Sequence, residues 1–256
     1  MSHSVRLSSD LASHLSAGSP DNQSVEITPQ IHGIDFQGRV WAYACLERDR
    51  ITLIDSGVAD RVDTALESIR TTGRAIGDVR QVILTHGHKD HTGLVVELKR
   101  RSGAAVIAHA LDAPTIRGQE QLADPLLTDS ERRIMEQISA DMPDAEPVDV
   151  DQELRDGDEI EIADENARVV HLPGHTPGSI GVFMPKSRVL FTGDAAASVS
   201  GQSVVGYFNI DRAQARRSFA RLADLDFEVA CFGHGPPLLK DASLAFRREA
   251  ELLSRT

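Results

Sequence analysis

Apolar residues in the first part of the chain occur as short runs bounded by turn residues, and then at helical spacing. Runs rich in Val and Ile at residues 24–31, 40–47 and 51–54 predict three strands. Within residues 60–72, apolar positions repeat every three to four residues, and Gly73 follows as a stop signal. The folded part is therefore predicted to begin with strands that one amphipathic helix covers.

The same succession of strands and helices then occurs a second time. Further strands are predicted at residues 81–84, 104–108, 159–162, 167–171, 179–184, 188–191 and 227–232. Helices are predicted at 90–101, from Asp211 onward and at 241–254, and Asp211 with Gln214 has the spacing of a capping box. The polar, helical pattern at 114–142 predicts an inserted helical pair over one edge. We therefore expect an α+β fold of two sheets packed face to face with helices outside.

Composition is consistent with one globular domain. The chain has 256 residues, 41% of them hydrophobic and only 4% aromatic, so Val, Ile, Leu and Ala must build the core. Residues 1–23 are polar and Ser-rich, and we expect a flexible extension there and a single domain at 24–256. There is no apolar signal segment, no run near the ~18 residues of a membrane span, and no CxxC pair. These features predict a cytoplasmic protein with reduced thiols and no membrane partner.

The net charge of -12 narrows the class of partner. Nucleic-acid affinity depends on Lys and Arg against phosphates, so an acidic chain is not expected to bind nucleic acid. We expect a small-molecule substrate, and bound metal ions could still attract a small anion locally. Assembly into a homo-oligomer stays open.

Histidine is the most informative residue type. His86, His88 and His91 fall within six residues, with Asp90 among them, in a Gly-containing loop that follows a predicted buried strand. A metal ion is the simplest partner that satisfies several imidazoles and a carboxylate crowded together. His86 and His88 point the same way in an extended loop, whereas Asp90 and His91 project differently. This loop could therefore supply two adjacent metal sites.

Three further donors each follow a predicted strand. His175 and His234 lie in loops shaped by Gly and Pro, and Asp194 comes directly after an apolar strand, where an unpaired carboxylate is costly. Their shared placement indicates one common site, although the sequence shows no distances between them.

These segments together resemble the motifs of the metallo-β-lactamase superfamily. Residues 85–93, Thr-His-Gly-His-Lys-Asp-His-Thr-Gly, resemble its HxHxDH signature, and residues 53–57, 171–178, 191–194 and 233–235 resemble its other motifs in the same order. The resemblance covers residues 24–240, and the combination is far more specific than HxHxDH alone. It implies a four-layer αβ/βα sandwich of two mixed sheets with helices on the outside.

The resemblance also implies roles for single residues. His86, His88 and His175 would hold one metal, Asp90, His91 and His234 a second, and Asp194 would bridge both. Asp55 resembles the aspartate that orients the histidine loop from behind. His109 and His171 match no ligand position and are expected to be structural, and no role is expected for His3, His14 and His32.

Such a site predicts a dinuclear metal-dependent hydrolase. Two divalent ions, two carboxylates and a bridging hydroxide leave about one positive charge, which favours attack on a carbonyl or phosphoryl centre. Asp90 could orient the hydroxide and pass its proton to the leaving group. Five histidines and two carboxylates favour zinc, with iron and manganese as alternatives. The favoured reaction is hydrolysis of a carboxylic ester, thioester or lactone.

The chain lacks most of the features that distinguish the known subfamilies of this superfamily. β-Lactamases of this family usually lack the bridging aspartate, glyoxalase II has a further helical domain, and tRNA nucleases carry a basic arm. Lactonases typically place a tyrosine where this chain has Ala197, although Tyr207 could substitute. A mononuclear iron dioxygenase acting on persulfides, and phosphodiesterase or β-lactamase activity, remain alternatives. Residues 114–142 and 198–209 are expected to select the substrate, with Arg117 and Arg132 as candidate anchors.

Overall fold

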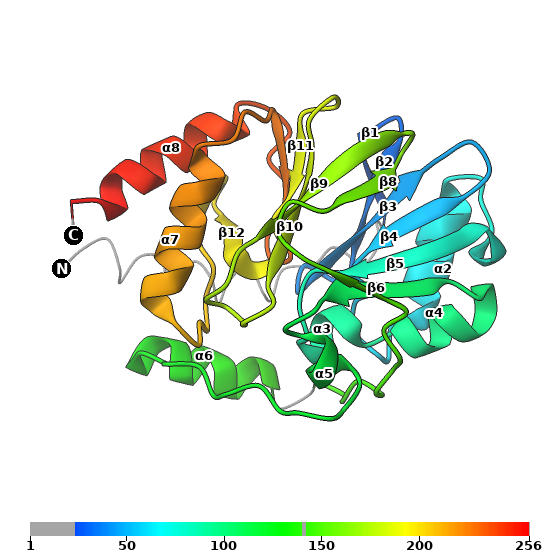
Figure 1. Cartoon of the computed structure of the whole chain (residues 1–256), viewed down its shortest axis with the longest axis horizontal. Coiled ribbons are helices and arrows are strands. Elements are labelled where there is room, and N and C mark those ends of the chain that lie inside the picture. Colours follow the sequence, from blue (N-terminus) through cyan, green and yellow to red (C-terminus); the bar gives the residue numbers. More distant parts are fainter. Residues whose placement is uncertain (1–23, 140–141, 256) are drawn as a thin grey trace.

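The computed structural model describes residues 24–139 and 142–255, arranged as two sheets between two helical layers (Figure 1). The predicted extension at 1–23, with His3 and His14, lies outside these residues, so the domain boundary there stays a prediction. Two helices, α2 (Val62–Thr71) and α4 (Val95–Ser102), flank one sheet, and α7 (Arg212–Ala223) and α8 (Ala242–Leu253) flank the other. The expected sandwich of two mixed sheets is confirmed. Within the described residues, no helix is both long and apolar enough to cross a membrane.

The first sheet has seven strands in the order β1 to β7, antiparallel from β1 to β4 and parallel from there on. Its strands are β1 (Ser24–Thr28), β2 (Ile31–Asp35), β3 (Trp41–Leu46), β4 (Ile51–Ile54), β5 (Val79–Leu84), β6 (Ala105–His109) and β7 (Gln152–Leu154). The single strand predicted at 24–31 is wrong, because the chain turns at Pro29 and Gln30 and pairs with itself. The short strand β7 was not predicted.

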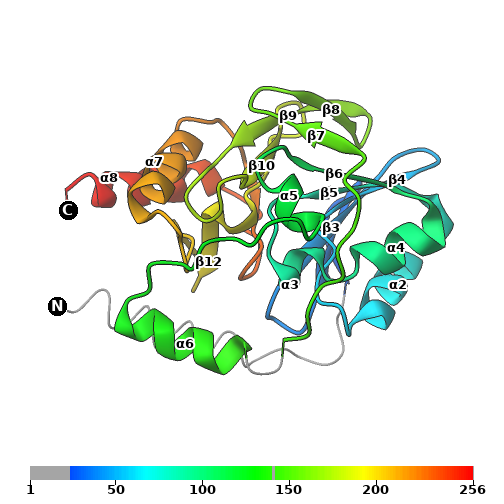
Figure 2. The same cartoon turned by 60° about the horizontal axis from the view of Figure 1, so that its bottom comes forward.

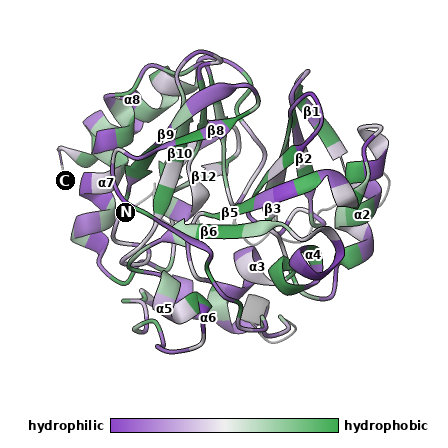
Figure 3. Cartoon of the chain, turned by 45° about the vertical axis from the view of Figure 1, so that its right-hand side comes forward, coloured by the Kyte–Doolittle hydropathy of each residue, from purple (hydrophilic) through white to green (hydrophobic). Residues whose placement is uncertain are grey.

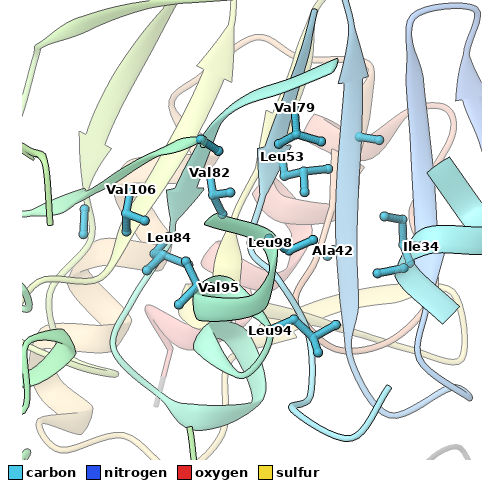
Figure 4. Close-up of a cluster of buried hydrophobic side chains, with 14 of the residues drawn as sticks. Ile34, Ala42, Leu53, Val79, Val82, Leu84, Leu94, Val95, Leu98 and Val106 are labelled. Carbon is cyan, nitrogen blue, oxygen red and sulfur yellow. The ribbon is translucent and has the colours of Figure 1, made fainter. Parts of the chain in front are cut away.

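Helices α2 (Val62–Thr71) and α4 (Val95–Ser102), joined to the sheet partly through the 3-10 turn η1 (Ile76–Asp78), cover the outer face of this sheet. Figure 4 shows Val95 and Leu98 of α4 against Val82, Leu84 and Val106 of β5 and β6. All five side chains are buried. Since burial of one such side chain stabilises by roughly 1.5–3 kcal/mol, this layer holds β5 and the loop after it in place.

The second sheet has five strands in the order β14-β11-β10-β9-β8. They are β8 (Glu159–Ile162), β9 (Glu165–His171), β10 (Ile180–Met184), β11 (Val189–Phe191) and β14 (Val229–Cys231). Helices α7 (Arg212–Ala223) and α8 (Ala242–Leu253) pack on its outer face through Phe219 and Phe246. Alternate strand residues such as Tyr43 and Phe191 fill the space between the sheets. The hydrophobic colouring in Figure 3 accordingly gathers on the strands.

The N-terminus of α7 bears out half of the predicted capping box. Asp211 Oδ1 accepts a hydrogen bond of 2.8 Å from Gln214 N. The reciprocal bond is absent, because Asp211 N donates to Gly174 O and the Gln214 side chain accepts from Arg217. This arrangement ties the start of α7 to the loop that carries His175.

The helix predicted at 90–101 is two helices, α3 (Lys89–Thr92) and α4, separated at Gly93. A Cβ at Gly93 would lie 2.4 Å from Ala59 N and 2.6 Å from Gly57 O, so the backbone there passes close to the loop after β4. Ser56 Oγ accepts a hydrogen bond of 3.2 Å from Leu94 N, the residue just before the second helix. The break leaves α3 free to point its side chains toward the sheet edge.

The insertion at 114–142 contains the short helix α5 (Ala113–Ile116) and the longer α6 (Asp129–Ser139), joined by an extended segment rather than packed as a helical pair. In Figure 2, α6 lies apart from both sheets, below β12 (Ala196–Val199). Ile134 of α6 packs on the hairpin of β12 and β13 (Gln202–Val205), which the sequence analysis missed. Arg212 donates to Leu126 O and pairs with Glu131, so the insertion spans from one sheet to the other.

Candidate metal centre

Seven donor side chains lie together where strands of both sheets end. The loop after β5 and helix α3 supply His86, His88, Asp90 and His91. The other three follow strands of the second sheet: His175 follows β9, Asp194 lies in the 3-10 turn η2 (Gly193–Ala195) after β11, and His234 follows β14. Parallel pairing of β11 with β14 brings the Asp194 and His234 loops side by side. A bond of 2.9 Å from Ile180 N to Thr85 O joins the two sheets at this edge.

Three groups of donor atoms could each hold a metal ion, with all atoms of a group within 4.8 Å of one another. The groups are His86, His88 and His175; His86, His91 and Asp194; and Asp90, His91 and His234. Asp194 lies centrally, because its carboxylate is 3.5 Å from His175 Nε2 and 3.1 Å from His234 Nε2. The structure thus brings together all seven residues that the sequence selected.

Four of the five histidines are held from behind through Nδ1. The contacts are His86 to Thr85 Oγ1 at 3.0 Å, His91 to Asp55 Oδ2 at 2.8 Å, His175 to Tyr207 O at 2.9 Å and His234 to Arg39 O at 2.5 Å. A carbonyl or carboxylate oxygen can only accept, so Nδ1 carries a proton, and the lone pair of the neutral ring lies on Nε2, which faces the site. Such partners are typical of metal-bound histidines.

His86 follows the same logic through Thr85. The Thr85 hydroxyl donates to Asp55 Oδ2 at 2.8 Å, so its lone pair is left to accept from His86 Nδ1. His88 is the exception, because its Nδ1 faces His175 Nε2 at 2.9 Å. Two ring nitrogens at this distance require a proton or a cation between or beside them.

Buried atoms without partners provide the test of whether a metal fits. His86 Nε2, His91 Nε2 and Asp194 Oδ1 are buried, and none forms a hydrogen bond of good geometry, although His91 Nε2 lies 3.3 Å from Asp194 Oδ1. Each such group costs about 1–3 kcal/mol when it is left unsatisfied. Two divalent cations, one beside His86 and one beside His91 with Asp194 between them, would satisfy all three, and imidazole nitrogen with carboxylate oxygen is a donor set that zinc accepts. The residues present therefore fit a metal centre.

The charges of the site are arranged in the same sense. Burial lowers the pKa of His86 and His88, and that of His175 to about 4, so these rings are neutral ligands at pH 7. Burial alone would lower the pKa of His234, but the carboxylates of Asp194 and Asp90 outweigh this effect and raise that pKa to about 10. The carboxylates thus attract positive charge, which a proton on His234 or a metal ion in its place would supply.

Asp55 lies behind the histidine loop, as the resemblance implied. It adopts a left-handed backbone conformation with φ of 61°, which aspartate tolerates better than most residues. Its carboxylate accepts from Thr85 N at 2.7 Å, from the Thr85 hydroxyl and from His91 Nδ1. One side chain therefore sets both the loop backbone and the direction of His91.

Asp112 is a positioning residue that the sequence analysis missed. It is fully buried and accepts three hydrogen bonds, from Gly87 N at 2.9 Å, Thr176 Oγ1 at 2.6 Å and Gly178 N at 2.6 Å. It thus joins the loop of His86 and His88 to the loop of His175. A carboxylate just after the predicted strand at 104–108 was the available signal, the same one that selected Asp194.

The remaining candidates lie elsewhere. The rings of His109 and His171 stack on each other outside the cluster, with their centroids 4.2 Å apart, and His32 lies on β2. Arg117 binds Glu153 and Val150 O, so it is not a substrate anchor at the site. Arg132 is exposed on α6 and does not line the pocket over the donor cluster.

A pocket of about 250 Å³ opens over the donor cluster. Its lining residues are His88, Lys89, Asp90, His175, Asp194, His234, Pro125, Met135, Met142 and Phe208. The last four come from the two segments that were expected to select the substrate. Tyr207 does not line it; the backbone carbonyl of Tyr207 instead orients His175.

Comparison with known proteins decides the family. The model of the metallo-beta-lactamase superfamily matches residues 34–234. The chain belongs to this superfamily. The probable metallo-hydrolase YflN of Bacillus subtilis is 28% identical over 75% of this chain and 78% of its own. A hydroxyacylglutathione hydrolase of Rhodospirillum rubrum is 27% identical over 62% of this chain, and GloC of Haemophilus influenzae 28% over 58%.

The chain spans only 48% and 61% of those two superfamily members. Among solved structures, the Rm3 metallo-beta-lactamase matches with a TM-score of 0.70 and 22% identity over 95% of this chain and 94% of its own. A metallo-beta-lactamase family protein from Thermus thermophilus matches with a TM-score of 0.66 and 23% identity over 90% and 81%. These likenesses show the metallo-beta-lactamase fold.

Proposed function

We propose that this superfamily member is a dinuclear metal-dependent hydrolase that cleaves a carboxylic ester, thioester or lactone. One observation carries the proposal: seven nitrogen and oxygen donors converge, and four histidines are fixed from behind with Nε2 turned inward. The names of the relatives, a probable metallo-hydrolase and hydroxyacylglutathione hydrolases, support hydrolysis and favour an acyl bond.

The proposed metal pair is zinc. His86, His88 and His175 would hold one ion, Asp90, His91 and His234 the other, and Asp194 lies between the two groups. When bound, such ions supply a water of lowered pKa and positive charge for the oxyanion that forms on a carbonyl. Iron and manganese accept the same donors, and elemental analysis distinguishes them from zinc.

The residues of the chain supply orientation and proton transfer. Burial opposes ionisation of Asp90, but His91 and His234 outweigh it and hold its pKa below the ordinary value. Asp90 is therefore an ionised carboxylate that lines the pocket, 3.3 Å from His234 Nε2. In this position it would take a proton from the attacking water and deliver it to the leaving group.

A mononuclear iron dioxygenase is the alternative from another class of enzyme. It would need only two histidines and one aspartate, whereas this site keeps Asp90, His91 and His234 in one group as well. The complete second group favours the hydrolase. Likeness to β-lactamase structures at 22% identity supports the fold and gives no reason to propose antibiotic hydrolysis.

We also propose a small-molecule substrate, no nucleic-acid or membrane partner, and a cytoplasmic location. The net charge of -12 and the small pocket support the first two statements. Both cysteines are buried and unbonded, which is typical of a reducing compartment.

Metal analysis and turnover together test the proposal. Protein reconstituted with zinc should hold about two ions per chain and hydrolyse at least one of a panel of acyl thioesters, lactones and aryl esters. Asp194→Ala should lose bound metal and turnover, whereas His32→Ala, on β2, should lose neither. One iron per chain with oxygen consumption, or full turnover by Asp194→Ala, would overturn the proposal.

A further inference from the structure

The pocket over the donor cluster has one polar and one apolar side. The donors form the floor, and Pro125, Met135, Met142 and Phe208 form a wall of carbon and thioether groups, which we term the apolar wall. The wall comes from two segments far apart in sequence, the insertion and the loop between β13 and α7. A volume of about 250 Å³ is below the ~300–1,000 Å³ of pockets that enclose drug-sized ligands. Only a small part of a substrate fits inside.

Phe208 is placed in this wall at a cost to the backbone. Its φ is 56°, in the left-handed region that bulky residues rarely adopt. Strain of this kind amounts to roughly 1–3 kcal/mol and persists where the surroundings enforce it. An aromatic residue kept in such a conformation beside a reaction site indicates a role for its ring.

The strained position is tied directly to the metal centre. His175 Nδ1 donates to Tyr207 O at 2.9 Å, and Ile210 N donates to His175 O at 3.3 Å, so His175 grips the backbone on both sides of Phe208. The insertion adds a third tie, because Leu126 N donates to Asn209 O at 3.0 Å. The backbone that carries the ring is therefore held at a fixed place relative to the donor cluster.

Charges along the apolar wall disfavour an anionic acyl group. Outside the donor cluster, Lys89 is the single cation among the lining residues, and its ammonium already donates to Met142 O and Asp144 Oδ1, each at 3.0 Å. An adjoining cavity of about 390 Å³ shares His88 and Lys89 but is otherwise charged by Glu120, Asp144 and Glu146. The positive charge that a metal pair would supply lies at the floor of the pocket. A carboxylate against the apolar wall or in the adjoining cavity would therefore lack a free counter-ion, and burying an unpaired charge is costly.

We infer that the apolar wall binds the acyl part of the substrate, and that this acyl group is short, uncharged and apolar. The inference rests on the proposed function and adds its substrate class. The acidic adjoining cavity further selects against a leaving group with several carboxylates, such as glutathione. The chain would thus differ in substrate from its hydroxyacylglutathione hydrolase relatives while it keeps their chemistry.

Matched substrates test the acyl class. Zinc-loaded protein is given acetyl, butanoyl and succinyl thioesters of N-acetylcysteamine, a neutral thiol, and butanoyl glutathione. Since each methylene in an apolar pocket is worth about 10-fold or more, kcat/KM should rise at least ~10-fold from acetyl to butanoyl. The succinyl and glutathione thioesters should each fall at least ~10-fold below the neutral butanoyl thioester. Equal or higher values for either would overturn the inference.

Variants of Phe208 assign the wall. Phe208→Ala should reduce the butanoyl-to-acetyl ratio to below ~3-fold, and Phe208→Leu should keep most of it. Leu239→Ala, an exposed apolar site elsewhere, should leave the ratio unchanged. An unchanged ratio in Phe208→Ala would refute the assignment. If zinc-loaded protein turns over none of the thioesters, lactones and aryl esters, the proposed function fails as well. If it turns them over but the kcat/KM ratios between substrates differ from those expected, only the inference about the acyl group is refuted.

Unfolding in urea gives a readout that is independent of turnover. Phe208→Gly and Phe208→Ala both remove the ring, but only glycine adopts a left-handed backbone without strain. Phe208→Gly should therefore unfold at a urea midpoint no lower than that of Phe208→Ala, despite the greater freedom of glycine in the unfolded chain. A clearly lower midpoint for the glycine variant would show that the strained backbone plays no part.

Discussion

Asp112 offers a sharp test of how the metal loops are held, because Asp112→Asn changes one oxygen to an amide nitrogen. In the protein, Oδ1 accepts from Gly178 N, and Oδ2 accepts from both Gly87 N and Thr176 Oγ1. The asparagine amide loses the fewest hydrogen bonds if its nitrogen takes the place of Oδ1, which accepts one bond, because its oxygen then keeps both bonds of Oδ2. Gly178 N–H, buried at this point, is then left without an acceptor and faces another donor.

The expected cost follows from this count. One buried donor without a partner costs about 1–3 kcal/mol. Part of this is offset, because burial raises the pKa of Asp112 and a neutral amide avoids that penalty. We expect Asp112→Asn to lower the free energy of unfolding by about 1–2 kcal/mol. Because one of the two bonds to the His175 loop, that from Gly178 N, is lost while those from Thr176 and Gly87 stay, metal affinity should fall about 10–100-fold.

Zinc affinity by chelator competition, measured beside urea denaturation, separates positioning from stability. Asp151→Asn is a matched control, because Asp151 also accepts from a backbone N–H, that of Val106, at 2.7 Å, and pairs with Lys99 away from the site. The control should lose stability without losing zinc affinity. If Asp112→Asn binds zinc as tightly as the unaltered protein, Asp112 is structural only, and the argument fails.

Three further predictions follow from the same geometry. Gly233→Ala would place a Cβ 2.1 Å from Asp194 Oδ1. This variant should therefore bind zinc less tightly and lose about 1–3 kcal/mol of stability, measured by thermal unfolding. The control Gly77→Ala, whose Cβ would have no atom within 4 Å, should keep both its zinc affinity and its stability. Removal of zinc with a chelator should lower the free energy of unfolding by about 4 kcal/mol, compared with protein in free zinc at 1,000 times the Kd. An unchanged free energy of unfolding would exclude a tight zinc site. Burial alone would raise the pKa of Glu131, but hydrogen bonds from Thr128 and Arg212 outweigh it and depress that pKa. The ionised side chain therefore stabilises the fold above the ordinary glutamate pKa of about 4.3, and this stabilisation is lost as pH falls through the depressed value. Glu131→Gln should therefore speed hydrogen exchange of α6 at pH 7, and equal rates would contradict the anchoring role.

Much of the architecture could be predicted because its signals are local. Strands such as β4 and β8 appear with the predicted bounds, since each is a short apolar run between turn residues. The errors occur where local pattern and tertiary contact diverge. Gly93 divides one predicted helix because the neighbouring loop passes too close for a side chain. The hairpin of β12 and β13 has little apolar pattern of its own, and Ile134 of a distant helix covers it.

By itself, the sequence determined the donor chemistry: which side chains can bind metal, and that each lies just after a strand. A strand-end position is encoded within a few residues, so His86, Asp194 and His234 could be selected without any distance. The tertiary structure alone decided which lone pairs face inward, because Arg39 and Tyr207 orient His234 and His175 through backbone carbonyls that no sequence pattern marks. It also decided the pocket. The apolar wall forms only where the insertion meets a loop some seventy positions later, and that meeting depends on packing between layers.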